Sequence, residues 1–388
     1  MGRSRKIVVA GFIVGFPLGG QVWAMIHFLL GLSRLGHEVL FLEDTSDWSY
    51  PFDPDSGYGL DSSFGRRTIE SIFARHAING RWAYNSILED KLYGVTRKEL
   101  DRFCSDADLL LNVSAVTPLR ENYMRCRKKA VIDTDPVFTQ ARIVEDQNLA
   151  VYYKAHDACF TYGWNLPEGK TRVPLSGLNW RPTLPPVVLE EWVGPDAPGG
   201  AYTTIGSWDT KDRDIVLDGE RLSWRKSVRY ESLIALPGLV PGARLELTFS
   251  GMGEEDGPRF ERHGWSVRDA IALSRDLEAY RNYIRSSRAE FTVAKDQNVR
   301  LKSGWFSDRS ACYLAAGRPV ITEDTGFDAY LPVGEGLFAF QSLEEAVRAI
   351  EAVEADPVRH GAAAHRIARE YFDAEKVLGE ILAELDLA

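Results

Sequence analysis

The sequence contains few cysteines and no excess of positive charge, and each shortage excludes a class of protein. Its 388 residues include four cysteines, and no two of them form a C-x-x-C pair. This spacing indicates neither a zinc site nor a disulfide framework, so we expect no bound metal and a cytoplasmic location. Lysine and arginine number 46 against 56 aspartate and glutamate residues, a formal net charge of -10. We expect no nucleic-acid partner, because binding phosphates requires clustered cationic side chains.

Charged residues are missing altogether from positions 7–33, a run that superficially reads as a signal peptide or a membrane anchor. The stretch from Phe16 to Gln21 interrupts this run with a proline and two glycines. A strand, a glycine turn and a buried helix explain the composition better than a lipid-facing helix does. We therefore expect no transmembrane segment here.

Length and composition predict a globular chain of two domains. Hydrophobic residues make up 45% of the sequence and charged residues 26%, which allows a sizeable core. Six prolines lie between Pro174 and Pro198, too many for a helix or a central strand, so this stretch is the predicted linker. The predicted division is an N-terminal acceptor domain (1–175), a linker (176–199), a C-terminal donor-binding domain (200–365) and a C-terminal helix (366–388).

Apolar strands alternate with helical segments in both domains, which predicts an α/β fold with two Rossmann-like parallel-sheet domains facing across a cleft. In the first domain we expect strands at 7–14, 38–42, 108–113, 130–133 and 158–162, with helices at 21–35, from Thr96 onward and at 119–128. In the second we expect strands at 201–205, 244–249, 290–294 and 319–322, with helices at 228–236, 266–286, 307–316 and 343–387. An ordered loop (50–65) would lie over the sheet edge, and Trp48 beside it could stack on an acceptor.

Ligands of such sheets bind beyond the carboxyl ends of the strands, so the loops after strands are the candidate sites. Gly19, Gly20 and Gln21 follow the first strand, where missing side chains would let an acceptor or a phosphate approach the backbone.

A dinucleotide-binding turn is the competing interpretation of this loop. That turn needs G-x-G-x-x-G, whereas Gly11, Gly15 and Gly19 recur at every fourth position. Glu43, as a ribose ligand, would then lack its partner motif. A nicotinamide-dependent oxidoreductase is therefore disfavoured.

The first strand of the second domain is followed by Gly206 and Ser207, and Lys226 lies just before the next helix. A lysine at a glycine loop is a suitable counter-charge for a diphosphate. The alternative is that Lys226 and Arg225 form a solvated pair on the surface.

The strongest local pattern runs from Gly304 to Gly326. Ser307 or Asp308 can cap a helix whose first-turn N–H groups would bind phosphate, and Arg309 can supply a two-pronged guanidinium contact. The next strand ends at an acidic loop whose oxygens could bind sugar hydroxyls. The donor-binding residues predicted in this segment are Ser307, Asp308, Arg309, Ser310, Glu323, Asp324 and Thr325.

The element order, the Gly-Gly loop followed by residues 35–39 (Leu-Gly-His-Glu-Val) and the late residues 316–320 (Ala-Gly-Arg-Pro-Val) resemble nucleotide-sugar glycosyltransferases of the glycogen synthase kind. That resemblance implies the GT-B fold. It places Gly19 and Gly20 at the donor phosphates or the acceptor, Gly206 and Lys226 at the diphosphate, and 307–310 below it. The family's two glutamates, eight residues apart, are matched here by Gly304 and Cys312, so the usual ribose contact is absent.

The family's His-Asp pair is matched most nearly by Asp133 and Asp135, which lie at the carboxyl end of a strand. Either carboxylate could take a proton from the acceptor or stabilise an oxocarbenium-like transition state. Asp before Pro is equally a turn former. Lys295, at the end of another strand, could reach the donor or be solvated.

We therefore expect a metal-independent glycosyltransferase without a cofactor, which uses a nucleotide-sugar donor and a small-molecule or lipid-like acceptor. The alternatives are a nucleotide-sugar epimerase or a pseudo-glycosyltransferase on the same fold, or a non-catalytic partner subunit.

Overall fold

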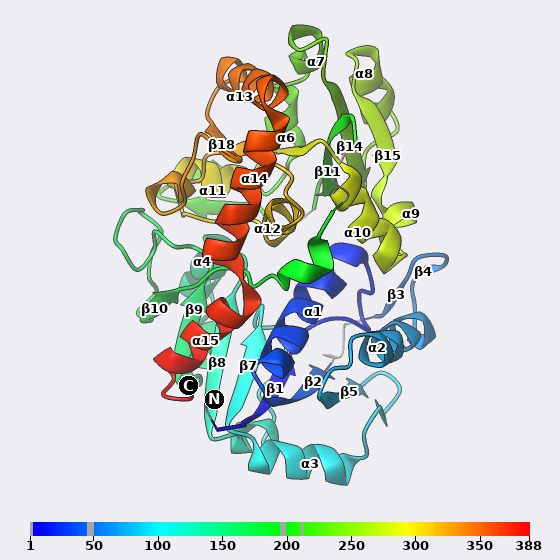
Figure 1. Ribbon diagram of the computed structural model, residues 1–388. Coiled ribbons are helices and arrows are strands. Elements are labelled where there is room, and N and C mark those ends of the chain that lie inside the picture. The colour runs from blue at the N-terminus through cyan, green and yellow to red at the C-terminus, as the bar shows by residue number, and fades with distance from the viewer. Residues whose placement is uncertain (1–2, 45–49, 195–198, 211–212) are drawn as a thin grey trace.

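The computed structural model describes residues 3–44, 50–194, 199–210 and 213–388 and places them in two layered α/β units (Figure 1). Trp48 and the linker residues 195–198 lie outside the described residues. Each unit contains one large sheet with helices packed against it, so the predicted fold class is confirmed.

The first sheet has eight strands in the order β10-β9-β8-β7-β1-β2-β5-β6, and every pair is parallel except β5 and β6. The central strands carry continuous apolar runs because helices cover both faces. Val8 in β1 pairs with Leu40 on one side and with Leu110 on the other. The strands are β1 (Lys6–Ala10), β2 (Glu38–Asp44), β5 (Gly80–Ser86), β6 (Lys91–Tyr93), β7 (Leu109–Val113), β8 (Lys128–Asp133), β9 (Ala158–Thr161) and β10 (Trp180–Pro182).

The helices of the first unit are α1 (Gly19–Arg34), α2 (Ser63–Arg75), α3 (Arg97–Asp106), α4 (Phe138–Glu145) and α5 (Gln147–Lys154). Thr96 opens α3 through a reciprocal capping box with Glu99. The helix predicted over 119–128 is wrong: a single 3-10 turn, η1 (Tyr123–Arg125), takes its place, and Lys128 already belongs to β8. The Arg120 side chain forms a two-pronged ion pair with buried Asp44, which draws the segment toward the sheet.

The second sheet has six parallel strands in the order β15-β14-β11-β16-β17-β18. Its strands are β11 (Ala201–Ser207), β14 (Arg244–Ser250), β15 (Ser266–Asp269), β16 (Ala289–Thr292), β17 (Val320–Glu323) and β18 (Leu337–Phe340). Its helices are α6 (Ser227–Glu231), α7 (Leu236–Leu239), α8 (Asp256–Arg262), α9 (Ala270–Ser274), α10 (Leu277–Ser286), α11 (Asp296–Leu301) and α12 (Asp308–Ala315). The helix predicted over 266–286 is wrong for residues 266–269, because these form strand β15, which pairs with β14.

Two short hairpins and three 3-10 turns complete the two units. The hairpins are β3 (Phe52–Asp53) with β4 (Gly57–Tyr58) and β12 (Ile215–Leu217) with β13 (Glu220–Leu222), and the remaining turns are η2 (Leu189–Trp192) and η3 (Phe327–Ala329). The predicted linker is not irregular throughout, because β10 adds to the first sheet from within it. Pro182 is tolerated there because β10 is an edge strand.

The C-terminal helices return the chain to the first unit. They are α13 (Leu343–Ala355), α14 (Pro357–Ile367), the π-helical turn η4 (Ala368–Phe372) and α15 (Ala374–Glu384). The backbone N–H of Val187 in the linker donates to Phe372, and the N–H of Ala374 donates to Val187. These hydrogen bonds join the linker to the C-terminal segment. Helix α15 then packs on α1, and both termini lie close together in Figure 1.

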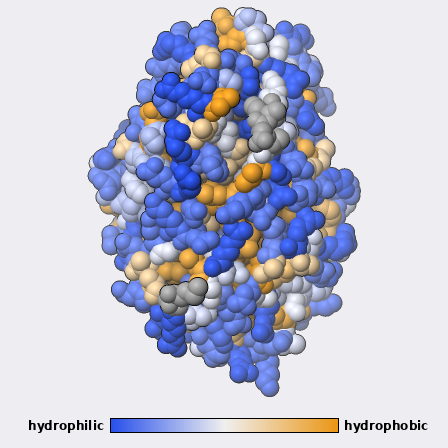
Figure 2. Space-filling view, in the orientation of Figure 1, coloured by the Kyte–Doolittle hydropathy of each residue, from blue (hydrophilic) through white to orange (hydrophobic). Residues whose placement is uncertain are grey.

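The charge-free run over 7–33 is explained by the position of α1. This helix contacts β2, α9, α10 and α15, so nearly all of its sides are buried. Among the described residues, no helix has the length and apolar character needed to cross a membrane. Figure 2 shows a face of the molecule that is mainly hydrophilic, with small hydrophobic groups scattered over it.

Gly31 of α1 and Gly379 of α15 provide a matched test of this packing. A Cβ on Gly31 would lie 2.6 Å from Leu378 Cδ1 and 3.0 Å from Ala374 Cβ, whereas a Cβ on Gly379 would meet no atom within 4 Å. We expect Gly31→Ala to lower the free energy of unfolding by about 1–3 kcal/mol through overpacking. Gly379→Ala should raise it by about 0.5–1 kcal/mol through helix propensity. Urea denaturation measures both, and shifts of the same sign would contradict the packing.

Candidate functional site

Asp135 and Lys295 meet across the cleft between the two sheets. Asp135 follows β8 of the first sheet and Lys295 follows β16 of the second, so both come from the carboxyl ends of strands. Lys295 Nζ lies 2.9 Å from Asp135 Oδ1, and Arg213 Nη1 lies 3.4 Å from Asp135 Oδ2. The structure thus brings a predicted catalytic residue and a predicted donor-side residue into direct contact.

Aromatic side chains form the surroundings of this ion pair. Lys295 Nζ lies 3.2 Å from the ring centroid of Trp224 and 5.8 Å from that of Trp305. Trp305 Nε1 donates a hydrogen bond of 3.2 Å to the carbonyl oxygen of Thr134, directly before Asp135. The rings restrict solvent on one side of the charges, which strengthens the interaction between them.

The ion pair sets the protonation states of its members. Burial opposes the ionisation of Asp135, but Lys295 and Arg213 outweigh it and hold the pKa of this carboxyl below its ordinary value. Burial lowers the pKa of Lys295, and Asp135 offsets part of that change. Asp135 is therefore a carboxylate at neutral pH, able to stabilise positive charge or accept a proton.

Asp133, the other predicted catalytic residue, is turned inward and is 1% exposed. Its two carboxylate oxygens accept hydrogen bonds from Thr139 Oγ1, Gln140 Nε2, Thr161 Oγ1 and the backbone N–H of Asp135. Burial raises the pKa of Asp133, while these hydrogen bonds work against that rise. The geometry gives Asp133 a supporting place behind the loop rather than a place facing the cleft.

Gly206, Lys226 and Arg309 converge in the second domain, as predicted from the sequence. A Cβ on Gly206 would lie 3.5 Å from both Lys226 Nζ and Arg309 Nη1. Lys226 is 9% exposed, and in the described part of the chain its ammonium group has a ring contact with Phe249 but no hydrogen bond or ion pair. Burial, then Arg309 and Lys295, lower the pKa of Lys226 well below its ordinary value.

Arg309 is committed to contacts inside the second domain. Its Nε pairs with Glu290 Oε1 at 2.5 Å, Nη1 donates to the carbonyl oxygen of Ile205, and Nη2 donates to Thr292 Oγ1. Burial works against its charge, but Glu290 raises the pKa of Arg309 above its ordinary value. In this structure the prongs of Arg309 hold the sheet and its positive charge lies beside Lys226, and the two-pronged contact with a phosphate stays a prediction.

Helix α12 begins at the cleft without a side-chain cap among the described residues, although a cap by Ser307 or Asp308 was predicted. Ser307 Oγ and the N–H of Arg309 donate instead to Asp308 Oδ1. Ser310 is 1% exposed, and its hydroxyl has no hydrogen-bond partner within the described part. A cavity of about 10 Å³, the size of one water molecule, lies beside Ser307, Arg309 and Ser310.

The side chains of the acidic loop after β17, which were predicted to bind sugar hydroxyls, contact other residues of the chain in this structure. Glu323 accepts hydrogen bonds from Arg229 and from the N–H of Ala294, and burial raises its pKa. Asp324 pairs with Lys302 at 2.7 Å. Thr325 donates its hydroxyl hydrogen to the carbonyl oxygen of Trp305.

The glycine loop of the first domain packs against the second domain. A Cβ on Gly19 would lie 2.5 Å from Tyr280 Cγ, and one on Gly20 would lie 3.1 Å from the Tyr280 hydroxyl. The space that was predicted for a ligand at these glycines is filled by the ring of Tyr280 in α10. Gln21 donates to the carbonyl oxygen of Phe12, and Ser207 is exposed at the end of β11.

Glu43 holds the loop that precedes the glycines. Its carboxylate accepts the backbone N–H groups of Ile13, Val14 and Gly15 at 2.6–2.8 Å. Successive N–H groups of this kind form an anion-binding concavity, and here a side chain of the same chain occupies it. This contact replaces the ribose role that the disfavoured dinucleotide interpretation assigned to Glu43.

Several residues of the site were not predicted from the sequence: Arg213, Trp224, Trp305, Tyr280, Glu290 and Gln140. Glu290 alone gave a usable signal, because a carboxylate within a central strand requires a buried partner. For most of the others the contact that defines the role is made with a distant segment, so no local pattern marks it. Among the residues described, no group of three or more His, Cys, Asp or Glu side chains could hold a metal ion.

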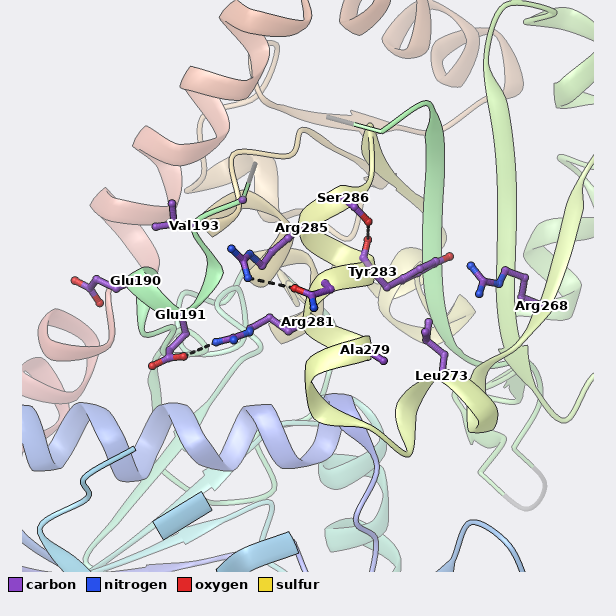
Figure 3. Close-up of a pocket in the computed structure, with 12 residues that line it drawn as sticks. Glu190, Glu191, Val193, Arg268, Leu273, Ala279, Arg281, Tyr283, Arg285 and Ser286 are labelled. Carbon is purple, nitrogen blue, oxygen red and sulfur yellow. Dashed lines mark hydrogen bonds and ion pairs between the residues drawn. The ribbon is translucent and has the colours of Figure 1, made fainter. Parts of the chain in front are cut away.

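A separate hollow of about 790 Å³ lies between the linker and α10, away from this site (Figure 3). Arg281 pairs there with Glu191, and Arg285 Nη1 donates to Asn282 Oδ1. No predicted site residue lines this hollow.

The chain forms two α/β domains whose sheets face each other at their carboxyl edges. This arrangement is the GT-B fold. No protein-family model and no curated protein sequence matches the chain. Among solved structures, HepE from Anabaena in complex with UDP-glucose matches with a TM-score of 0.58 at 13% identity, covering 99% of this chain and 100% of that chain.

Two other solved structures extend the comparison. AviGT4, a glycosyltransferase involved in avilamycin A biosynthesis, has a TM-score of 0.58 at 11% identity, covering 98% of this chain and 96% of that chain. A Listeria monocytogenes protein assigned as a UDP-N-acetylglucosamine 2-epimerase has a TM-score of 0.53 at 11% identity, covering 100% of this chain and 98% of that chain. These likenesses confirm the predicted GT-B fold, and the activity has to be argued from the site.

The stability that Glu43 confers is expected to depend on pH. Burial raises the pKa of its carboxyl to about 7, against an ordinary value of 4.5, although three backbone hydrogen bonds lower it. Because the folded state then binds the proton more tightly than the unfolded state, the free energy of unfolding falls as the pH rises from about 4.5 to about 7. This group contributes a loss of at most about 3 kcal/mol.

Glu43→Gln removes this titration. Relative to the native chain, the variant should therefore gain stability as the pH is raised across that interval, and thermal melts at about pH 4.5 and about pH 7.5 measure the change. A constant difference in Tm between the two proteins would show that Glu43 does not titrate there.

Proposed function

We propose that the protein transfers a sugar from a nucleotide diphosphate sugar to a small-molecule or lipid-like acceptor. The donor's diphosphate binds at Lys226 and the N-terminus of α12 in the second domain. The acceptor binds on the first domain, near Asp135. Both HepE, solved with UDP-glucose, and the glycosyltransferase AviGT4 share the fold, which supports UDP-glucose as the first donor to test.

The observation that carries this proposal is the buried amine of Lys226, which contacts the ring of Phe249 but makes no hydrogen bond or ion pair in the described part of the chain. A buried cation without a counter-charge is unfavourable, and proteins either neutralise it or supply an anion. Glu290 pairs with Arg309, and burial keeps the pKa of Lys226 well below its ordinary value, so a bound anion would favour the charged form of this amine. A diphosphate between Lys226 and the hydroxyl of Ser310, which has no hydrogen-bond partner among the described residues, satisfies both groups and meets the positive end of α12.

The two departures from the family's glutamate pair are structural positions in this chain. Gly304 has a φ of +76° and faces Asn165, and the buried thiol of Cys312 lies 3.6 Å from His27 Nε2. Neither position offers a carboxylate to a ribose. The donor's nucleoside is therefore held by other contacts, and the diphosphate contributes the main recognition.

The cationic surroundings also favour a mechanism without a metal ion. Lys226 and the field of Arg309 offset charge that develops on the leaving diphosphate, as magnesium does in other transferases. Asp135, kept ionised by Lys295 and Arg213, stabilises positive charge on the sugar or takes the acceptor's proton.

Binding of UDP tests the donor site directly. A ligand that binds only the native state raises its apparent stability, so UDP should raise the Tm of the native chain. Lys226→Met should weaken UDP binding by about 10- to 100-fold, the effect of losing a hydrogen bond to a charged group. Arg225→Met is the matched control, because Arg225 is the exposed neighbour of Lys226. Equal loss in the two variants would favour a general surface attraction over a diphosphate site.

Turnover of UDP-glucose tests the role of Asp135. Asp135→Asn should lower the rate of glucose release to acceptor or water by at least about 100-fold, with UDP affinity unchanged within about threefold. The native rate should be the same with a chelator or with added magnesium. Product analysis without acceptor distinguishes the alternatives, because an epimerase converts UDP-glucose to another UDP-sugar. An undiminished rate in Asp135→Asn would exclude the proposed role of that carboxylate.

A further inference from the structure

The loop that carries Asp135 has an unusual backbone, and one buried side chain holds it. Val137 has φ 78° and ψ -60°, a conformation that a β-branched residue rarely adopts, and it is 1% exposed. Such a conformation persists only where surrounding contacts fix it.

Gln140, in the first turn of α4, provides those contacts with both ends of its amide. Its Oε1 accepts the backbone N–H of Val137 at 2.7 Å, and its Nε2 donates to Asp133 Oδ2 at 2.8 Å. The residue is fully buried, so water does not compete for either hydrogen bond. The donor and acceptor assignments follow from the two partners, since a backbone N–H can only donate and a carboxylate accepts.

Asp133 extends this contact to Asp135. The other oxygen of Asp133 accepts the backbone N–H of Asp135 at 3.1 Å and the hydroxyl of Thr139 at 2.7 Å. The chain of contacts therefore runs from Val137 through Gln140 and Asp133 to the backbone of Asp135. Hydrogen bonds to Asp133 and Gln140 thus hold the backbone at both ends of the loop. The Asp135 carboxylate is directed across the cleft to Lys295.

We propose that Gln140 is a positioning residue that holds the 134–137 loop so that Asp135 reaches Lys295 and Arg213. This inference rests on the proposed function for its effect on catalysis, but its structural part can be measured without turnover. Gln140 affects the reaction by positioning Asp135 and does not contact the substrate.

Hydrogen exchange measures the structural part. Gln140→Met keeps the volume of the side chain and removes both hydrogen bonds. The amides of Asp135 and Val137 should then exchange at least about tenfold faster, the effect of losing one hydrogen bond. Gln297→Met is the matched control: Gln297 is fully buried near the same cleft, and neither polar atom of its amide has a partner in the described part of the chain. Unchanged exchange in Gln140→Met, or equal acceleration in both variants, would overturn the proposal.

Turnover separates this proposal from the proposed function. With UDP-glucose, Gln140→Met should lower kcat while the Kd for UDP stays that of the native chain, and Gln297→Met should lower neither. If Asp135→Asn abolishes turnover and Gln140→Met leaves kcat unchanged, Gln140 does not position the carboxylate. If Asp135→Asn leaves turnover intact, the catalytic role of Asp135 fails, and hydrogen exchange alone decides the role of Gln140.

Gln140→Glu gives a signature that a loss of folding does not produce. At low pH, the new carboxyl can share one proton with Asp133 and still accept the N–H of Val137, so the loop should keep its protection. As the pH rises, two adjacent carboxylates repel each other, and protection should be lost with one apparent pKa for the pair.

Other titratable groups near Asp133 do not produce this transition. Asp135 is held ionised by Lys295 and Arg213, burial keeps the pKa of Tyr153 well above its ordinary value, and burial raises the pKa of Cys159 to about 12. Protection that is independent of pH in Gln140→Glu, after correction for intrinsic exchange, would contradict the proposed network.

Discussion

The ion pair between Asp135 and Lys295 joins the functional edges of the two sheets. Each residue lies directly beyond the carboxyl end of a strand, so the pair aligns β8 of one sheet with β16 of the other. Lys295 is largely buried against the ring of Trp224, and removal of either partner would leave a desolvated charge. The spacing of the cleft at this point is therefore set by electrostatics as well as by packing.

Charges around the cleft are balanced unequally. Arg309 has Glu290, Arg229 has Glu323, and Lys302 has Asp324, each within the second domain. Lys226 has no such partner in the part of the chain that is described. The acidic loop and the guanidinium group of Arg309 thus support the scaffold, whereas burial lowers the pKa of Lys226 and disfavours its charged form.

Local sequence patterns predicted most elements because they depend on near neighbours. The charge-free run gave β1 and α1, and Thr96 with Glu99 marked the start of α3. The helix predicted at 119–128 failed because Arg120 is drawn to Asp44, which lies 76 residues earlier in the chain. Long-range partners of this kind leave no periodic signal.

The site residues show the same limit. The sequence placed Asp135, Lys226 and Lys295 at loops after strands, and the structure brings them to the cleft. It could not distinguish a glycine that faces a ligand from one that faces Tyr280, or a carboxylate that is open to sugar from one that is bound to Arg229. In each case the distinguishing partner comes from a segment far away in the chain.

The two glycine-containing loops finally differ in what they leave unsatisfied, and that difference supports the proposed donor site in the second domain. In the first domain, successive N–H groups could bind an anion, but Glu43 already occupies them. A diphosphate there would have to displace a buried carboxylate and the ring of Tyr280. Beside Gly206 in the second domain, the start of α12 has the buried amine of Lys226 and the hydroxyl of Ser310, which finds no hydrogen-bond partner in the described part of the chain. An added anion would displace no internal contact there and would favour the charged form of Lys226, which supports the proposed donor site.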